Sequence, residues 1–214
     1  MKSVVIGAHL QRDDVEPIAD AIPVSDLFLS VLAIDDDRPL SDRDLLLQIA
    51  DIRARLLDRA TFVAIRYGFA IRDPREAEIK CGTLVPRWRE LLDTHRDEVE
   101  MTLKVAVAVP AARPDRHDFA SGAAYLRALH QSANAVDIDP QFRGGVEKTL
   151  LPLTTQHRWI HRDAASLELA MLVRRNNLDK VRAAGESLRR DFQSVPFLLS
   201  GPWPLEVFAD DHQQ

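Results

Sequence analysis

The feature that most constrains the fold is a stretch of eleven residues in which every second side chain is apolar. The apolar positions are Val99, Met101, Leu103, Val105, Val107 and Val109, and the positions between them start with Glu100, Thr102 and Lys104 before they become alanine. Successive side chains of a β-strand point to opposite faces, so this alternation predicts a strand with one buried face. The chain is therefore expected to contain a sheet that is covered on one side.

Other patterns predict further strands and helices. Short apolar runs predict strands at residues 4–8, 26–34, 62–69, 167–173 and 195–199, with Gly68 as a bulge or a close approach of the backbone. Capping residues predict helices that start at Ser41, Asp73-Pro74, Ser121 and Asn176. The first helix has an apolar face made of Leu45, Ile49, Ile52 and Leu56. Pro86 is expected to break the second helix, and Pro140 and Gly144-Gly145 to interrupt a helical stretch that resumes at 146–151.

The order of these elements predicts the fold class. From residue 99 onward the order is strand, helical region, strand, helix and strand, and one more short strand near 157–161 would complete a β-α-β-β-α-β unit of the ferredoxin-like kind. The predicted class is therefore α+β, with two small domains. Residues 1–97 are expected to form an N-terminal α+β domain, and residues 98–214 a ferredoxin-like domain with a short C-terminal tail.

Composition and charge restrict the partners. The 28 basic and 33 acidic side chains give a net charge of -5, which provides no electrostatic footprint for nucleic acid. No segment reaches the roughly 18 consecutive apolar residues of a membrane span, and the first residues lack the apolar run of about 7–15 residues of a secretory signal. The single cysteine, Cys81, excludes an intramolecular disulfide. We therefore expect a cytoplasmic protein with no nucleic-acid or membrane partner.

The most suggestive pattern for chemistry is His157-x-x-x-His161-x-Asp163. Two histidines four residues apart on a helix can share one metal ion, and Asp163 would add an oxygen ligand. No glutamate follows the first histidine, so the metalloprotease pattern is absent, and Arg158 and Arg162 would repel a cation. On a strand the two histidines would only share a face. We expect no metal here, and a metal-dependent hydrolase that uses these three residues stands as an alternative function.

The remaining candidates for catalysis carry weaker signals. Gly144-Gly145 lacks the spacing of a phosphate-binding loop, so a plain turn is expected. Cys81 has neither a neighbouring histidine nor a second cysteine and is expected to be a packing residue, and the nucleophile motif GxSxG is absent. The sequence predicts no catalytic, cofactor-binding or metal-binding residue, and we do not expect an enzyme.

Trp203 stands between two prolines, Pro202 and Pro204, directly after the last predicted strand. The prolines fix φ and remove two backbone donors around the aromatic side chain. One interpretation is a rigid corner, in which a buried Trp203 packs on the end of the C-terminal sheet. The other is a preorganised aromatic anchor for a partner. The physical argument favours the buried corner, and both interpretations can hold together.

Several motifs, in this order along the chain, resemble those of the gas vesicle protein F/L family. FVAIRYG at 62–68 resembles a family strand that ends in an arginine, an aromatic residue and a glycine, here Arg66, Tyr67 and Gly68. VEMTLKV at 99–105 is similar to its strand with Glu100 and Lys104, SGAAYL at 121–126 to a helix start with Tyr125, and LELAMLVRR at 167–175 to the strand before its last helix. The most specific match is GPWP at Gly201, Pro202, Trp203 and Pro204, followed by an aromatic residue at Phe208.

The resemblance implies an α+β domain joined to a ferredoxin-like domain, and a role as a minor component or assembly factor of gas vesicles. These are hollow protein shells that make bacteria buoyant. Such a protein would bind the small, very hydrophobic shell protein and other gas vesicle accessory proteins, and would limit aggregation of the shell protein during nucleation. Binding through an exposed sheet edge or an apolar surface is expected.

The resemblance carries over no catalytic residue, so the matched residues are expected to be structural or partner-binding. It implies a location in the cytoplasm, at the gas vesicle. A small-ligand regulatory domain is a further alternative, since ferredoxin-like units host many functions.

Overall fold

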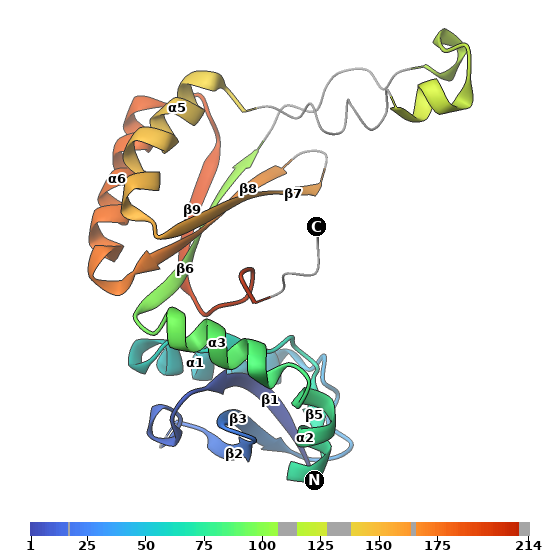
Figure 1. The fold of residues 1–214 in the computed structure, drawn as a ribbon, viewed down its shortest axis with the longest axis vertical. Helices are drawn as coiled ribbons and strands as arrows, with labels where there is room; N and C mark the ends of the chain where they lie inside the picture. The colour runs from blue at the N-terminus through green and yellow to red at the C-terminus, as the bar shows by residue number, and fades with distance from the viewer. Residues whose placement is uncertain (17, 107–114, 128–137, 164–165, 210–214) are drawn as a thin grey trace. The chain divides into compact units, whose positions relative to one another are not determined.

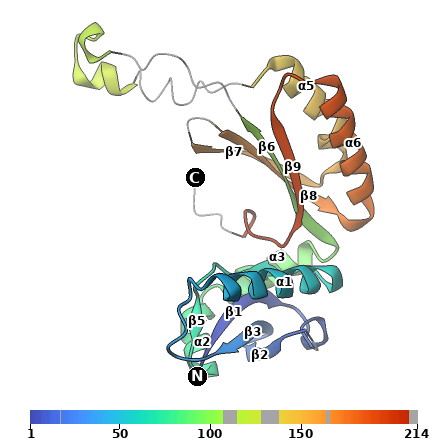
Figure 2. The same ribbon diagram turned by 180° about the vertical axis from the view of Figure 1, so that it is seen from behind.

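The computed structural model describes residues 1–16, 18–106, 115–127, 138–163 and 166–209, apart from the side chains of residues 162 and 163. The chain divides into two compact units, one formed by Met1–Glu100 with Pro202–Gln214 and the other by Met101–Gly201 (Figures 1 and 2). The first unit therefore contains both the start of the chain and its C-terminal tail.

The first unit is built on an antiparallel sheet. Its elements are β1 (Lys2–His9), η1 (Arg12–Asp14), β2 (Asp20–Val24), β3 (Leu27–Ile34), α1 (Arg43–Arg59), β4 (Val63–Ala64), β5 (Ala70–Ile71), α2 (Pro74–Cys81) and α3 (Val85–Thr94). The strand order is β2-β3-β1-β4, and β5 also pairs with β1. β3 lies on one side of β1, and β4 and β5 lie on the other, all antiparallel to it. Both α1 and α3 cover the same face of this sheet (Figure 1).

Local sequence explains the helices of the first unit. Asp42 caps α1 by accepting a hydrogen bond from the backbone N–H of Leu45 (2.7 Å), one residue after the predicted cap Ser41. The predicted apolar face of α1 is confirmed, because its four residues are buried: Leu45, Ile49, Ile52 and Leu56. Asp73 caps α2, and Pro86 lies in the first turn of α3, where a proline needs no backbone donor.

The second unit is a sheet covered by two helices. Its elements are β6 (Glu98–Ala106), η2 (Arg116–Asp118), α5 (Pro140–Thr149), η3 (Leu151–Leu153), β7 (Gln156–Asp163), β8 (Ser166–Arg174), η4 (Arg175–Asn177), α6 (Leu178–Asp191) and β9 (Phe197–Trp203). The strand order is β7-β8-β6-β9, and α5 and α6 lie on one face (Figures 1 and 2). The described elements follow the β-α-β-β-α-β order of a ferredoxin-like unit. The predicted α+β class is confirmed.

The alternating apolar side chains of β6 build the core of the second unit. Met101, Leu103 and Val105 of β6 are buried against Phe142 and Val146 of α5. β6 ends at Ala106, and the rest of the predicted strand, residues 107–109, lies outside the described residues. Further along, Ser121 Oγ accepts a hydrogen bond from the N–H of Ala124 (3.1 Å), and residues 122–127 are helical.

The structure corrects the predicted strand at 62–69. These residues form the two-residue β4 and then a turn, in which Gly68 adopts a φ of +88°. A positive φ turns the chain away from an extended path, and this conformation favours glycine. The strand β2 was not predicted, because Pro23 and Asp20 in this segment are both unfavourable in strands.

The predicted interruption at Pro140 and Gly144-Gly145 is wrong. α5 starts at Pro140, with Asp139 as its cap, and continues through both glycines to Thr149. Gly145 allows close packing of α5, since a Cβ atom there would lie 2.7 Å from Phe192 Cε2. Tertiary packing therefore outweighs the low helix propensity of glycine.

The predicted domain boundary and the two units differ at the C-terminal end. The prediction assigned 98–214 to one domain, whereas the tail from Pro202 groups with the first unit. The physical reason is that Leu205 and Phe208 of the tail are buried there, beside β4 and Glu100. Among the described residues, no helix is long and apolar enough to cross a membrane.

Candidate partner-binding site

The Arg66-Tyr67-Gly68 motif forms the turn between β4 and β5, on the edge of the first sheet. The backbone N–H of Phe69 donates to the Arg66 carbonyl oxygen (3.3 Å), which closes the turn. Tyr67 is 50% exposed. The turn therefore presents an aromatic side chain to solvent.

Arg53 of α1 fixes this turn from the inside. Its guanidinium carbon lies 4.1 Å from the centre of the Tyr67 ring, and its Nη2 donates a hydrogen bond to the carbonyl oxygen of Ile65. Such a cation–π contact restricts the orientation of the ring. Tyr67 is thus held in place while half of its surface remains free of the protein.

The GPWP motif spans the end of β9 and the start of the tail. β9 ends with Gly201, Pro202 and Trp203, and Pro204 follows it. Gly201 adopts a φ of +120°. Trp203 is 48% exposed, so the prediction of a buried tryptophan is wrong. The buried residues of this region are instead Pro204, Leu205 and Phe208, because the chain turns its apolar side chains inward only after Trp203.

The tail docks beside β4 through its backbone. The N–H of Leu205 donates to the carbonyl oxygen of Phe62, and the N–H of Ala64 donates to the carbonyl oxygen of Leu205, both at 2.9 Å. Leu205 thereby forms a parallel bridge with Val63. The Leu205 side chain is fully buried. The tail acts as a short extra strand of the first sheet.

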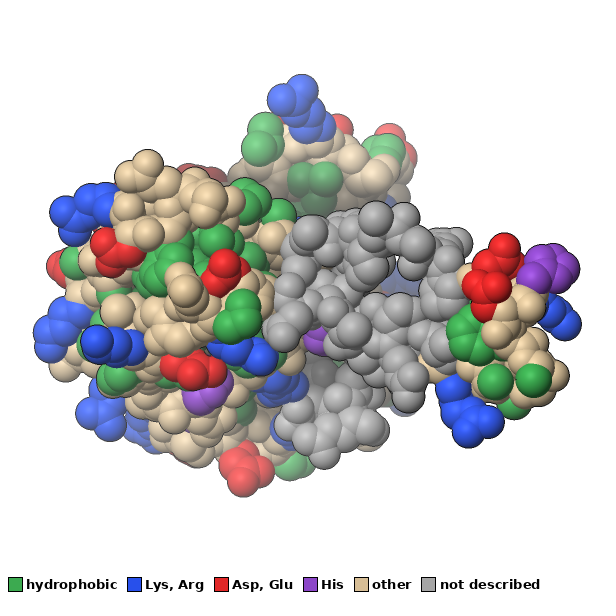
Figure 3. Space-filling model, turned by 90° about the horizontal axis from the view of Figure 1, so that it is seen from above, with side chains coloured by type: hydrophobic (Ala, Val, Ile, Leu, Met, Phe, Trp, Pro, Cys, Tyr) green, Lys and Arg blue, Asp and Glu red, His purple; other side chains and the backbone are tan. Residues whose placement is uncertain are grey.

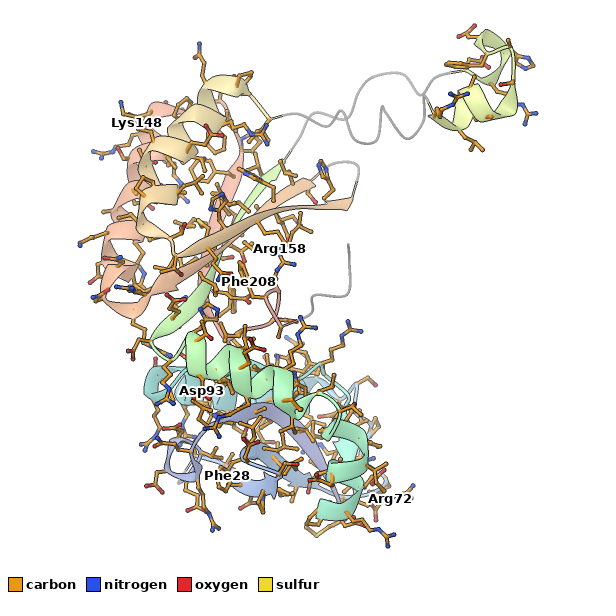
Figure 4. All side chains as sticks on the ribbon, viewed as in Figure 1. Phe28, Arg72, Asp93, Lys148, Arg158 and Phe208 are labelled. Atoms are coloured by element: carbon orange, nitrogen blue, oxygen red, sulfur yellow. The ribbon has the colours of Figure 1, made fainter. Side chains whose placement is uncertain are left out.

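The carboxylate of Glu100 holds the next part of the tail. Oε1 accepts hydrogen bonds from the N–H groups of Glu206 and Phe208 (both 2.9 Å), and Oε2 accepts one from Val207 (3.1 Å). Phe208 lies beside the first residues of β6 (Figure 4). Burial raises the pKa of Glu100 to about 6, although the three backbone donors favour the charged form and act to lower it.

Two motif residues lie in the second unit. Lys104 of β6 is half-exposed, and its Nζ lies 3.9 Å from Glu168 Oε1 of β8. Tyr125 belongs to the helical residues 122–127, with its ring centre 5.9 Å from that of Phe119. The structure thus joins Glu100 and Phe208 in one cluster, and places Lys104 and Tyr125 elsewhere.

The histidine pattern lies on a strand. His157 pairs with Met171 and His161 with Leu167, across β7 and β8. Four residues of a strand span about 13 Å, so the two imidazoles do not converge on one ion. The side chain of Asp163 lies outside the described residues. Among the residues that the structure describes, no group of three His, Cys, Asp or Glu side chains could hold a metal ion.

Some buried polar groups were not predicted. His9 Nε2 lies 2.9 Å from Ser30 Oγ, and His95 Nδ1 lies 2.6 Å from Glu98 Oε2. Both pairs are buried, as is Cys81, whose thiol pKa is raised by burial. The position of His9 at the end of an apolar run was the only sequence signal for its burial. These groups belong to the interior of the first unit, because they are buried away from solvent.

Charged side chains do not gather into one basic patch on the face shown in Figure 3. On the described part of that face, Lys and Arg side chains are scattered, with Asp and Glu side chains between them. Arg158 projects from β7 (Figure 4). A phosphate backbone would require a continuous basic stripe.

Comparisons with known proteins show the family and the solved structures to which this chain is similar. The profile of the family described as "Gas vesicle synthesis protein GvpL/GvpF" matches residues 16–209. The crystal structure of the gas vesicle protein GvpF from Anabaena sp. PCC7120 superposes with a TM-score of 0.71, at 13% identity over 99% of both chains. GvpF from Microcystis aeruginosa gives a TM-score of 0.70, at 11% identity over 98% of this chain and 99% of that one.

At this level of identity the two structures show a shared fold. A search of curated proteins gives no match. The profile match covers most of the chain, including the RYG turn, Glu100 and the tail up to Ala209. The chain therefore belongs to the gas vesicle GvpL/GvpF family.

Proposed function

We propose that this chain is a cytoplasmic assembly protein that binds the hydrophobic gas vesicle shell protein, and limits its aggregation while vesicles nucleate. The observation that carries the proposal is the family match over residues 16–209. Other gas vesicle accessory proteins are proposed as further partners. The role is non-enzymatic: the chain acts by binding and not by chemical conversion.

Two half-exposed aromatic side chains support binding of an apolar partner. Tyr67 is held over Arg53, and Trp203 lies between two prolines. Aromatic residues are enriched in protein interfaces, and anchors that are fixed before binding lose little conformational entropy. A partner with exposed apolar surface would gain contacts with each of these side chains.

The acid-base groups of the first unit support a non-enzymatic role. The His95–Glu98 pair and the Glu100 carboxylate are buried and already hydrogen-bonded within the protein. A general acid or base must come within hydrogen-bond reach of a substrate. His95 binds Glu98, and Glu100 binds the backbone of the tail, so each group already has a partner inside the protein. A structural role is therefore the better explanation of their burial.

Co-expression of this chain with the shell protein tests the proposal. We expect the wild-type chain to increase the soluble fraction of shell protein and to co-purify with it. Tyr67→Ala and Trp203→Ala should reduce both by at least tenfold. Ile79→Ala and Leu198→Ala remove apolar side chains that are 73% and 57% exposed, lie outside the family motifs, and serve as controls. Shell protein that pellets to the same extent with and without this chain would refute the function.

A further inference from the structure

The tail binds the first unit through backbone hydrogen bonds and buried side chains, as a peptide does when it adds a strand to a sheet. A bound strand contributes backbone hydrogen bonds to a sheet edge, and its alternate side chains fill pockets. Leu205 makes two backbone hydrogen bonds, one to Phe62 and one to Ala64 of β4, both at 2.9 Å, and its side chain is fully buried. The geometry points to a strand-acceptor site, formed by β4 and Glu100, for an extended apolar segment of a partner chain. Residues 204–209 occupy this acceptor site in the free protein.

Glu100 is the second part of the acceptor site, beside β4. Its carboxylate binds three consecutive backbone N–H groups, at Glu206, Val207 and Phe208, and does not contact their side chains through these bonds. This recognition requires only that none of the three positions is proline. Hydrogen bonds to an ionised acceptor are about twice as strong as those between neutral groups. The acceptor site therefore takes the backbone of any segment that can adopt this shape.

Side-chain burial defines the chemistry of the ligand. Leu205 and Phe208, three residues apart, are 0% and 7% exposed, and Ala209 is 9% exposed. Glu206, between them, is exposed. A matching ligand has one large aliphatic residue, two residues other than proline, a large aromatic residue and then a small residue. Such an apolar segment suits the partner in the proposed function, and its identity as shell protein rests on that function.

Two other backbone carbonyl groups at this sheet edge are hydrogen-bonded to side chains. Arg53 donates to the carbonyl oxygen of Ile65, and Lys80 Nζ donates to that of Ala70 (2.9 Å). The backbone groups of Phe62 and Ala64 are instead bonded to the tail. The tail is flanked by Trp203 and Glu206, both exposed, so it lies along the surface. A competing strand that replaces the tail must therefore bury the same apolar surface that Leu205 and Phe208 cover.

The resident tail is a strong competitor because it is tethered. Short flexible tethers give effective concentrations in the millimolar range, so a free peptide binds the wild-type chain weakly. A test must compare a chain whose tail is locked in place with one whose tail can leave. Val63 and Leu205 form a bridge, and neighbouring strands lie about 4.8 Å apart, which falls within the Cα separations that a disulfide spans.

The test uses the full chain with Val63→Cys, Leu205→Cys and Cys81→Ala. The probe is a fluorescein-labelled peptide with the sequence of residues 202–209, PWPLEVFA, and its binding is measured by fluorescence anisotropy. We expect the reduced chain to bind the peptide at least tenfold more tightly than the oxidised chain. The control peptide PWPAEVAA should bind neither form. Equal binding to both forms would place the peptide elsewhere and overturn the acceptor site.

A second variant covers the case in which the reduced tail still competes. In Leu205→Ala/Phe208→Ala the tail loses both apolar anchors, whereas the residues of β4 and Glu100, which form the acceptor site, are unchanged. This variant should bind PWPLEVFA at least tenfold more tightly than the wild type, and no binding would refute the acceptor site. If wild-type chains instead form concentration-dependent dimers that the disulfide prevents, the occupant is the tail of a second copy, and the assignment to a partner chain is wrong.

The shell protein then separates this inference from the proposed function. Binding of shell protein to the reduced chain but not to the oxidised chain supports both. Equal binding to the two forms supports the proposed function and overturns the acceptor site as its location. Binding of the peptide without any binding of shell protein supports the acceptor site and refutes the proposed function.

Discussion

At the residue scale, the tail contains two aromatic side chains with opposite roles. Trp203 is 48% exposed and Phe208 is 7% exposed, although both belong to the family motif. The flanking prolines of Trp203 made burial a reasonable expectation from sequence. The sequence did not indicate that the chain continues beside β4 and buries Leu205, because one isolated bridge leaves no periodic pattern.

We therefore expect alanine substitutions of the two aromatic residues to differ in their effect on the free energy of unfolding. Phe208→Ala removes a buried ring and should lower the free energy of unfolding by about 3–5 kcal/mol. Trp203→Ala should lower it by less than about 1 kcal/mol, since much of the indole is already in contact with water. Denaturant titration of both variants measures this difference. An equally large loss for Trp203→Ala would restore the interpretation of a buried corner.

His9 is fully buried and stacked on Phe62, with ring centres 4.9 Å apart. Ser30 Oγ donates to the carbonyl oxygen of Gly7 (3.3 Å), so His9 Nε2–H donates to Ser30 Oγ. His9 Nδ1 has no hydrogen-bond partner among the described residues. A proton on Nδ1 would have no acceptor, and burial lowers the pKa of His9 to about 3.

This shift makes the protein less stable in acid. Between about pH 6.5 and 3 the unfolded chain binds a proton at His9 and the folded chain does not, so the free energy of unfolding falls as the pH falls. The slope approaches about 1.4 kcal/mol per pH unit. Glu100 opposes it between about pH 6 and 4.5, because its pKa is raised by burial and the folded chain then binds the additional proton.

The variant His9→Gln separates these two groups. The free energy of unfolding of the wild type minus that of His9→Gln should fall by up to about 1.4 kcal/mol per pH unit as the pH falls from 6.5 to 4. Glu100 contributes equally to both curves, so this difference isolates His9. Urea titrations at half-unit pH intervals provide the measurement. His157→Gln, at an exposed position, should follow the wild-type curve. Parallel curves for His9→Gln and the wild type would show that His9 is not the titrating group.

At the element scale, α5 shows why a sequence pattern predicted the wrong boundary. Two adjacent glycines favour a break on propensity alone. The two positions are not equivalent in the structure. A Cβ atom at Gly144 would meet no atom within 4 Å, whereas one at Gly145 would lie 2.7 Å from Phe192 Cε2 and 3.1 Å from Leu188 Cδ2. Only the packing of α5 against α6 distinguishes them, and one sequence does not reveal it.

The glycine pair provides a matched test of that packing. Gly144→Ala should raise the free energy of unfolding by about 0.5–1 kcal/mol, through helix propensity. Gly145→Ala should lower it by about 1–3 kcal/mol, because Phe192 must shift from its edge-on contact with Phe142. Thermal melts of the two variants measure the opposite signs. Stabilisation by both substitutions would show that the side chains of α6 move away from position 145 without loss of stability.

The elements that could be predicted are those with a repeated pattern. The apolar residues alternate in β6 and recur every three or four residues in α1, and a capping residue marks the start of α2. β2 and β4 were missed or misjudged because they depend on their neighbours: β2 contains Pro23, and β4 has only two residues. The acceptor site depends on the same kind of long-range pairing, so only its separate parts, Glu100 and Phe208, could be named from sequence.

At the scale of the whole molecule, the free sheet edges carry features that oppose strand addition. β2 contains Pro23, β9 contains Pro202, and β7 has a register shift between His161 and Asp163. Prolines and bulges on edge strands prevent edge-to-edge association. For a protein proposed to act beside an aggregation-prone partner, this protection would keep the chain out of the aggregate. The edge at β4 is different, because a segment of the chain itself covers it.

Removal of one such feature tests this explanation. Pro23→Val restores a backbone donor on β2, and we expect the folded variant to self-associate, because proline in a sheet is confined to edges whose N–H side faces solvent. Its free energy of unfolding should stay within about 1 kcal/mol of the wild-type value, since Pro23 is exposed and valine favours strands. Size-exclusion chromatography with light scattering measures the mass, and Pro152→Val, at an exposed position outside the sheets, is the control. A monomeric Pro23→Val variant, even with shell protein present, would mean that this proline serves only the turn between β2 and β3.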